Sequence, residues 1–172
     1  MHSEPDPMSD LVTLELIRES LIAVVNEMRA NIIHSSYAPI IYEGHDFSCA
    51  LMAADGRQVA QGLADHPLHI FAVPYSTRQV VAAFGDDIHP GDLFLHNDPY
   101  LGNTHAADHT IIVPVFFEGE HFFSVGVKAH QADIGNSMPT TYMAPASDVY
   151  HEGALIFPCV QVQEDYRDND DI

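Results

Sequence analysis

The sequence has few basic residues and few cysteines. Six lysine and arginine residues stand against 25 aspartate and glutamate residues, so the 172-residue chain has a formal net charge of -19. Such a chain repels nucleic acid phosphates, and no stretch of it forms a basic patch, so nucleic acid is not an expected partner. Cys49 and Cys159 are far apart and lack a CxxC spacing. This pattern argues against a disulfide framework and a thiolate zinc site, and it favours the reducing cytoplasm.

Long hydrophobic runs and nucleotide-binding motifs are also missing. No apolar run approaches the roughly 20 residues of a membrane span, and the acidic start MHSEPDPMSD lacks the basic and apolar regions of a signal peptide. Gly56, Gly62 and Gly91 form neither a GxGxxG nor a P-loop pattern. We therefore expect a cytoplasmic protein without a nucleotide site of its own, so that any ATP is bound elsewhere.

Enough apolar sequence is present for one core. Apolar residues make up 47% of the chain, which at this length predicts a single domain, 1–172. Apolar residues at helical spacing from Leu11 to about Ala30 predict an amino-terminal helix, and from Phe47 onward short apolar runs between turns predict β-structure. We expect the α+β class, with an amino-terminal helix followed by a β-rich mixed body with short helices.

Three strand-containing segments are predicted within this body. Residues 47–60 read as a hairpin turned at Asp55 and Gly56, and residues 93–96 as a strand. Residues 110–130 read as two strands joined at Glu118-Gly119-Glu120. Because Pro114 lacks an N–H group, the first of these two strands is expected to be an edge strand or a bulged one.

Three further segments receive less regular predictions. A weak helix is expected at 76–84, and the HPLHI run at 66–70 is placed on a turn that leads into a strand. The acidic end EDYRDNDDI, at 164–172, has two interpretations of equal weight. It is either the first turn of a helix that the sequence does not complete, or a solvated and frayed tail.

Histidine and aspartate are concentrated in two segments, HNDPYLGNTHAADH at 96–109 and KAHQADIG at 128–135. Together these segments hold four histidines and three aspartates. Imidazole and carboxylate groups in combination suit a divalent ion such as zinc, manganese or iron. Two histidines with one carboxylate leave coordination positions open for water or substrate, so such a site favours chemistry over a purely structural role.

We favour His105, Asp108 and His130 as the metal ligands. The first two share a loop, and a hairpin after Asp108 returns the chain so that His130 ends beside its starting point. Four other residues are expected either to orient the ligands or to replace one of them: His96, Asp98, His109 and Asp133.

Each residue of this region also has a purely structural explanation. Asp98 before Pro99 can cap a turn, and His109 can be a hydrogen-bonded histidine of an edge strand. We expect Gly102, Asn103 and Gly135 to loosen the loops around the ligands. Taken together, the clustered histidines and aspartates favour a metal over these explanations.

The segment YEGHDFSCAL at 42–51 is expected to line the same cleft. Asp46 is its main candidate, and the expected catalytic residues are Asp46, His96 and Asp133. Cys49 is interpreted as a small core residue and Ser48 has no identified base, so nucleophilic catalysis is not favoured. For the two histidines of the HPLHI run, His66 and His69, packing beside the ligands is as consistent with the sequence as ligation.

Six segments resemble, in order, the hydantoinase B/oxoprolinase family. They are DPMSDLVTLELIRESLIAVVNEM, EGHDFSCALMAADGRQVAQ, HPLHIFAVPYSTRQVV, PGDLFLHNDPYLGNTHAADHTIIVPVF, KAHQADIGNSMP and YHEGALIFP. The family includes the B subunits of ATP-dependent hydantoinases, part of 5-oxoprolinase, and subunits of acetone and acetophenone carboxylases. Its members are several hundred residues long, so the resemblance implies that this chain is the amino-terminal portion of a longer subunit.

The resemblance implies a divalent metal at the positions of His105, Asp108 and His130. It also implies a hydantoinase A-type partner subunit that binds ATP and Mg and phosphorylates the substrate. The expected function is that of a metal-binding subunit of an ATP-dependent hydrolase of cyclic amides, with the isolated chain inactive. The alternatives are a subunit of an ATP-dependent ketone carboxylase and a non-catalytic assembly module with a structural metal. The departures from common family residues, at His109, Gln131 and Asn136, remove no proposed ligand.

Overall fold

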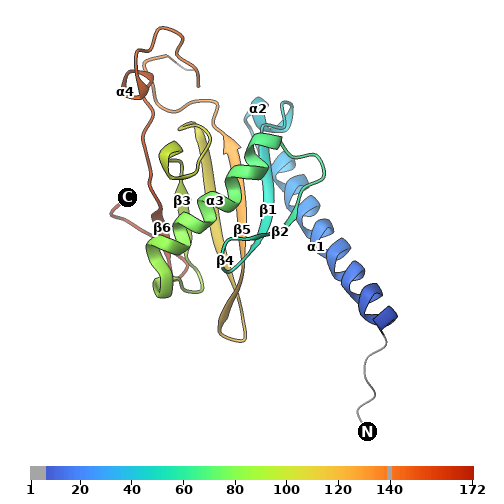
Figure 1. Cartoon of the computed structure of the whole chain (residues 1–172). Coiled ribbons are helices and arrows are strands. Elements are labelled where there is room, and N and C mark those ends of the chain that lie inside the picture. The colour runs from blue at the N-terminus through green and yellow to red at the C-terminus, as the bar shows by residue number, and fades with distance from the viewer. Residues whose placement is uncertain (1–6, 139–140) are drawn as a thin grey trace.

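A seven-stranded antiparallel sheet forms the centre of the protein (Figure 1). The computed structural model describes residues 7–138 and 141–172. The strands lie in the order β2-β1-β5-β4-β3-β6-β7. Their bounds are β1 (Phe47–Ala53), β2 (Gln58–Gln61), β3 (Leu93–His96), β4 (Asp108–Phe117), β5 (Glu120–His130), β6 (Val160–Glu164) and β7 (Arg167–Asp168).

Two long helices cover opposite faces of this sheet (Figure 1). Helix α1 (Pro7–Ser35) packs Val25 against Cys49 and Leu51 of β1, whereas α3 (Pro67–Phe84) packs Val73 against Ala50 and Met52. Because successive strand residues point to opposite faces, β1 is buried on both sides. The shorter elements are α2 (Pro39–Tyr42), α4 (Val149–Glu152) and the single 3-10 turns η1 (Gly85–Asp87) and η2 (Pro99–Leu101). The predicted α+β class is confirmed.

Helix α3 lies close to β5 because residue 126 is glycine. A Cβ atom at Gly126 would lie 2.5 Å from Cγ1 of Val73 and 2.6 Å from Cε of Met52. A larger side chain would therefore push the helix away from the sheet. This close approach places the first turn of α3 over the end of β5.

Most of the predicted elements are confirmed. The amino-terminal helix extends beyond its predicted bounds at both ends. The hairpin of 47–60 turns at Gly56, which has a φ of 79°. Residues 93–96 form β3, and the strands β4 and β5 pair across the turn at Glu118 and Gly119.

Two predictions about prolines need correction. Residues 66–70 do not lead into a strand, because His66 is the N-cap of α3 and Pro67 occupies the first helical turn, where its missing N–H group is tolerated. The helix therefore begins well before residue 76. Strand β4 is an interior strand rather than an edge strand, so only the bulged alternative fits: its pairing with β5 shifts register between Val115 and Phe116, just after Pro114.

The acidic segment at the end of the sequence is neither a helical turn nor a frayed tail over residues 164–168. Glu164 pairs with Arg167 in a β6–β7 hairpin. The hairpin turns at Asp165 and Tyr166, whose φ angles of 49° and 63° are of the kind that tight antiparallel turns require. Strand β6 in turn pairs with β3, so this hairpin extends the sheet.

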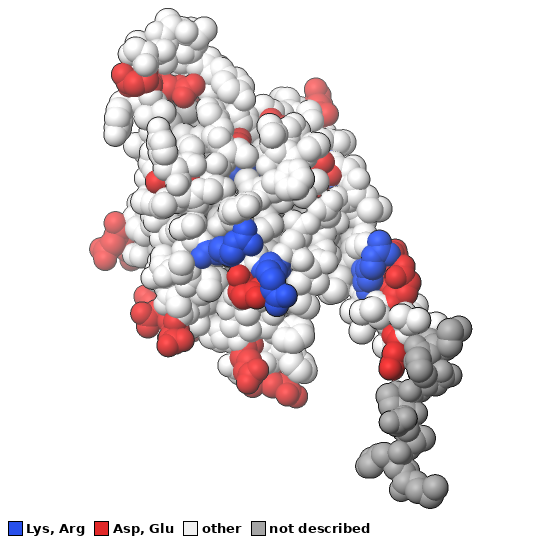
Figure 2. Space-filling view, viewed as in Figure 1, with Lys and Arg blue, Asp and Glu red and all other residues white. Residues whose placement is uncertain are grey.

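The charge distribution matches the acidic composition. On the face shown in Figure 2, acidic side chains are scattered and basic side chains gather mainly at two places, so that face offers no extended basic surface for nucleic acid. Two exposed arginines are paired with acidic residues: Arg18 with Glu15 and Glu19, and Arg57 with Asp55. Among the helices that the structure describes, none has the length and apolar character that crossing a membrane requires.

Candidate metal centre

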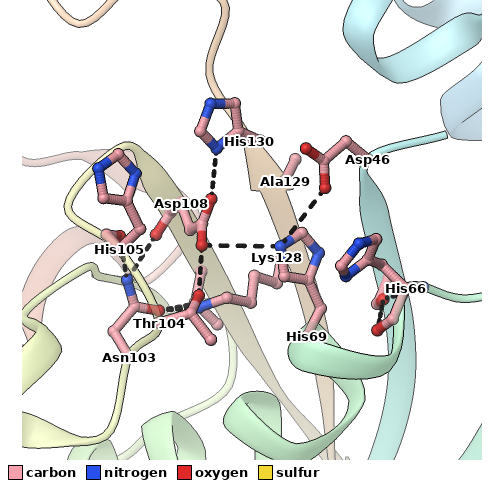
Figure 3. Close-up of polar contacts among 12 residues, drawn as sticks. Asp46, His66, His69, Asn103, Thr104, His105, Asp108, Lys128, Ala129 and His130 are labelled. Atoms are coloured by element: carbon pink, nitrogen blue, oxygen red, sulfur yellow. Dashed lines mark hydrogen bonds and ion pairs between the residues drawn. The ribbon is translucent and has the colours of Figure 1, made fainter. Parts of the chain in front are cut away.

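One end of the sheet gathers histidine and aspartate side chains from several segments (Figure 3). Asp108 begins β4 and His130 ends β5, and the two residues are register partners. Asp46 directly precedes β1, and its carbonyl oxygen accepts a hydrogen bond from the backbone N–H of His130 at 3.0 Å. The predicted return of the hairpin is confirmed, because it brings the loop that carries His105 and Asp108 beside His130.

These side chains surround a pocket of about 270 Å³. Its lining residues are Asp46, His66, Leu68, His69, Thr104, His105, Asp108, His130 and Tyr142. A larger hollow of about 370 Å³ lies at the β6–β7 hairpin, but it is lined by exposed charged and amide residues and contains no histidine. The histidine and aspartate side chains that could bind a metal therefore lie in the smaller pocket.

Asp108 is a buried carboxylate that stays ionised. Its Oδ1 lies 2.6 Å from Nδ1 of His130, and its Oδ2 accepts a hydrogen bond from the Thr104 hydroxyl. Burial raises the pKa of Asp108, but the contacts with His130, His69 and Thr104 and the charge of Lys128 outweigh burial and hold the pKa well below its usual range. The carboxylate is the form that binds a metal ion.

The rings of His105 and His130 stack beside this carboxylate. Their centroids lie 5.6 Å apart, and Tyr142 stacks within 5.5 Å of both. One ligand atom each of His105, Asp108 and His130 lies within 4.8 Å of the other two. Both nitrogens of His130 have contacts, because its Nε2 lies 2.7 Å from the Thr141 hydroxyl. Burial and the charges of Asp108, Asp46 and Glu152 raise the pKa of Tyr142, which therefore stays protonated.

A second group of possible ligands shares the pocket. One ligand atom each of Asp46, His66 and His69 also lies within 4.8 Å of the others. Nε2 of His69 lies 3.6 Å from Oδ1 of Asp46 and 3.6 Å from Oδ2 of Asp108, so His69 stands between the two groups (Figure 3). The sequence reasoning left both histidines undecided. Their i, i+3 spacing at a Pro-marked helix start was a signal that they share one face of a first turn.

The loop that carries His105 and Asp108 is held by Asn103 and Lys128. Nδ2 of Asn103 lies 3.0, 2.7 and 2.8 Å from the carbonyl oxygens of Asn97, His105 and Asp108. The amide oxygen of Asn103 accepts a hydrogen bond from Lys128. The expectation that Asn103 loosens this loop is therefore wrong, because its buried amide fixes the loop.

Lys128 was missed by the sequence reasoning, although it is the only lysine of the chain. It lies two residues before His130 on β5, so both side chains point to the same face of the sheet. Burial lowers the pKa of Lys128 to about 8, and the nearby Asp108 opposes this shift. A single lysine within the mainly apolar run 122–129 was the signal for a buried polar contact.

Two of the predicted catalytic residues lie outside the pocket lining. His96 is fully buried at the end of β3, where its Nε2 lies 3.2 Å from the carbonyl oxygen of Leu101 and its Nδ1 accepts from the Cys159 N–H at 3.3 Å. Burial lowers the pKa of His96, so the ring is neutral. Asp133 is exposed and accepts from the N–H of Gly135 at 2.8 Å.

The other two candidates from this region have structural roles. Asp98 caps η2 by accepting from the N–H of Tyr100 at 2.9 Å, as the structural alternative predicts. His109 packs edge-on against Phe157 within an interior strand, not at an edge. Of the six residues predicted as ligands or catalytic groups, the structure thus brings four together in the pocket: Asp46, His105, Asp108 and His130.

Cys49 and Ser48 have surroundings that disfavour a nucleophile. Burial, with the charge of Asp65 adding to it, raises the pKa of the Cys49 thiol to about 12, so the reactive thiolate is not populated at neutral pH. The Ser48 hydroxyl accepts a hydrogen bond from the backbone N–H of His66 at 3.1 Å. Cys49 therefore packs between β1 and α1, and Ser48 links β1 to the start of α3.

The donor set fits a divalent ion. Asp108 supplies a negative oxygen, and Nδ1 of His105 is buried without a hydrogen-bond partner among residues 7–138 and 141–172. A buried polar atom is normally satisfied, so this nitrogen has capacity for a ligand. Mixed nitrogen and oxygen donors accept zinc, manganese or iron.

Comparisons with known proteins agree with the family resemblance that the sequence shows. The profile of the hydantoinase B/oxoprolinase family matches residues 10–172. The chain is 34% identical over 149 residues to caprolactamase subunit beta of Pseudomonas jessenii. The aligned region covers 87% of this chain and 26% of that subunit. It is also 31% identical over 150 residues to 5-oxoprolinase 1 of Arabidopsis thaliana. This aligned region covers 87% of this chain and 12% of that protein.

Two solved structures share the fold. The ATP-dependent caprolactamase from Pseudomonas jessenii matches with a TM-score of 0.83 and 30% identity, over 98% of this chain and 28% of that chain. Acetone carboxylase matches with a TM-score of 0.81 and 22% identity, over 96% and 22% of the two chains. The chain thus spans only a part of the length of each relative. Since the family profile extends over nearly the whole sequence, the protein belongs to the hydantoinase B/oxoprolinase family.

Proposed function

We propose that this chain is the metal-binding portion of an ATP-dependent enzyme that hydrolyses a cyclic amide. A hydantoinase A-type partner subunit would bind ATP and Mg and phosphorylate the substrate, and the pocket described above would complete the reaction. The observation that carries the proposal is the convergence of His105, Asp108 and His130 beside Asp46 in one pocket. The names of the caprolactamase and oxoprolinase relatives support the substrate class and the use of ATP.

His105, Asp108 and His130 would hold a divalent ion, which supplies Lewis acidity for polarising a carbonyl oxygen and for making water more acidic. The side chain of Asp46 is 28% exposed and lines the pocket, so a water molecule can reach its carboxylate. We assign Asp46 the role of proton acceptor from that water. Tyr142 keeps its proton, so its phenol can donate a hydrogen bond to an oxygen of the substrate.

We propose indirect roles for the other two predicted catalytic residues. His96 contacts the carbonyl oxygen of Leu101 and so fixes the turn that leads into the loop of His105. Asp133 fixes the turn at Gly135 just after His130 leaves β5. Substitution of either residue would therefore change the position of a ligand without removing one.

The test uses the whole protein together with its partner subunit. ATP-dependent opening of a lactam, oxoproline or hydantoin is expected in the parent and is lost in Asp108→Asn. A matched control, Asp86→Asn, changes an exposed aspartate of η1 and keeps full activity. Bicarbonate-dependent consumption of a ketone, without ring opening, would contradict the proposal and favour a carboxylase. Full activity without bound metal would favour an assembly role for this chain.

A further inference from the structure

Helix α3 presents large apolar side chains to solvent on the side that faces away from the sheet. Leu68, Phe71 and Tyr75 are 64%, 74% and 56% exposed. Their i, i+3, i+7 spacing puts them in one row along the helix, and Arg78 continues the row at i+10. We call this row of four side chains the α3 stripe. The opposite side of the helix is already buried, because Val73 packs on the sheet.

The composition of α3 is unusual for a helix on the outside of an acidic protein. A helix at the surface normally carries charged residues on the side away from the core, whereas a helix that is apolar all round is normally buried. Arg78 is the only lysine, arginine, aspartate or glutamate among the 18 residues of α3, in a chain with 25 acidic residues. The helix therefore has the sequence of one that is covered on both sides.

Arg78 carries a positive charge that no carboxylate neutralises. Its Cζ atom lies 4.4 Å from the centroid of the Tyr75 ring, so the guanidinium group rests on that ring. In the part of the chain that the structure describes, Arg18, Arg29 and Arg57 form ion pairs with aspartate or glutamate and Arg78 forms none. Tyrosine and arginine are residues that often dominate the binding energy of protein interfaces. The charged end of the stripe is therefore suited to a carboxylate on another chain.

The stripe is held rigidly on the body of the protein. On the sheet side, α3 lies so close to β5 that a Cβ atom at Gly126 would be 2.5 Å from Cγ1 of Val73. On another side, a Cβ atom at Gly102 would be 2.8 Å from the Cβ atom of Tyr75, so the end of η2 lies against the stripe. A surface that is fixed before binding loses little conformational entropy when a partner docks.

The stripe begins at the mouth of the pocket of the candidate metal centre. Leu68 is the first residue of the stripe and also lines that pocket. A chain that covered the stripe would therefore border the pocket. In the proposed function the substrate is phosphorylated on the partner subunit and completes its reaction in this pocket, so an activated amide passes between the two chains. Such reactive intermediates are lost to bulk water, and a partner seated at the mouth would exclude water during the transfer.

We propose that the α3 stripe is the docking surface for the ATP-binding partner subunit, an inference that rests on the proposed function. The partner would offer an apolar groove to Leu68, Phe71 and Tyr75 and a carboxylate to Arg78. Amphipathic helices dock in grooves in this way, through side chains at i, i+3 and i+7. A second copy of this chain fits less well, because a second α3 has no acidic side chain to place opposite Arg78.

The experiment measures binding between the full-length protein and the ATP-binding partner subunit by isothermal titration calorimetry. Phe71→Asp puts a charge in the middle of the stripe and is expected to raise the Kd for the partner about 30-fold or more. The control Phe117→Asp makes the same change at an exposed phenylalanine beside the β4–β5 turn, at the end of the sheet far from the pocket (Figure 1). It is expected to bind the partner like the parent, and both variants are expected to keep the metal content of the parent.

Arg78→Met tests the charged end of the stripe independently. This change removes the charge and keeps an unbranched side chain. If a carboxylate of the partner faces Arg78, the variant binds about 10-fold more weakly, and its Kd changes less with salt concentration than the Kd of the parent does. The same affinity and the same salt dependence in both proteins would overturn the assignment of a carboxylate opposite Arg78.

The outcomes separate this inference from the proposed function. Equal partner binding by the parent and folded Phe71→Asp would overturn the docking surface, and ring opening by the same assembly would leave the proposed function intact. Binding that depends on Phe71, in an assembly that opens no cyclic amide, would support the surface and contradict the proposed function. A Phe71→Asp protein that unfolds in the absence of the partner would show that another part of its own chain covers the stripe, which overturns the proposal. A parent dimer that Phe71→Asp abolishes would identify a second copy as the occupant and also overturn it.

Discussion

Asp108 and His130 face each other as register partners at the open end of the β4–β5 hairpin, with Oδ1 of Asp108 2.6 Å from Nδ1 of His130. The hydroxyl of Thr141 contacts the other ring nitrogen of His130 at 2.7 Å. Binding of an ion by His130 therefore displaces one of these two contacts. The pairing of the strands fixes both proposed ligands, so their separation does not depend on a flexible loop.

Lys128→Met is expected to weaken metal binding about 10- to 100-fold without unfolding the protein. Lys128 donates to Asn103, which holds the loop of His105 and Asp108, and its charge lowers the pKa of Asp108. Chelator competition gives the metal Kd of the variant. The matched control Arg167→Met removes an exposed positive charge from β7 and is expected to bind like the parent. Equal affinity in Lys128→Met would show that the loop needs no support from this residue.

The metal-free protein is expected to lose stability in acid partly through Asp108. Its pKa is lower in the folded protein than the ordinary value of 3.8, so its ionised form stabilises the fold. This contribution is fully present above pH 3.8 and is lost as pH falls towards the folded pKa, at about 1.4 kcal/mol per pH unit. Urea unfolding of the parent and Asp108→Asn measures it. The free-energy difference between the two should shrink below about pH 4, and a difference independent of pH would contradict the assignment.

Cys49→Ala is expected to keep activity in the assembled enzyme and to lose about 1–2 kcal/mol of stability, because a buried sulfur atom is replaced by a small void. The raised pKa of Cys49 leaves it protonated at neutral pH. Thermal unfolding and the ring-opening assay measure the two effects. An inactive variant that is folded and loaded with metal would instead identify Cys49 as a nucleophile.

Gly126→Ala tests the close approach of α3 to the sheet. The added Cβ would meet Val73 and Met52, so we expect a loss of about 1–3 kcal/mol in the free energy of unfolding. Helix α3 would also shift, and with it His66 and His69. The control Gly119→Ala adds a methyl group at a turn with open space, although its φ of 85° carries its own strain. A Gly126→Ala variant as stable as the parent would mean that α3 adjusts freely.

The parts of the fold that local sequence patterns specify were predictable. Two apolar runs on either side of the turn at Glu118-Gly119-Glu120 identify β4 and β5, and antiparallel pairing then places Asp108 beside His130. The early start of α3 was not predicted, because Pro74 lies inside the helix and interrupts the pattern that a helix normally shows.

The contacts that support the site depend on tertiary structure and were not predicted. An asparagine next to a glycine usually indicates a loop that can adopt several conformations. The amide of Asn103, however, is buried against three carbonyl oxygens. His69 reaches the pocket only because α3 crosses the sheet close to Gly126. The sequence predicted the four residues that gather in the pocket, whereas the contacts that surround them follow from tertiary packing.

Elemental analysis of the parent protein beside His105→Ala, Asp108→Ala and His130→Ala tests the metal centre most directly, with circular dichroism as the folding control for each. The account predicts at least one ion per chain in the parent and about one ion fewer in each folded variant. Full occupancy retained in folded Asp108→Ala would contradict the assignment of that carboxylate as a ligand. Absence of metal from the folded parent would contradict the metal centre itself.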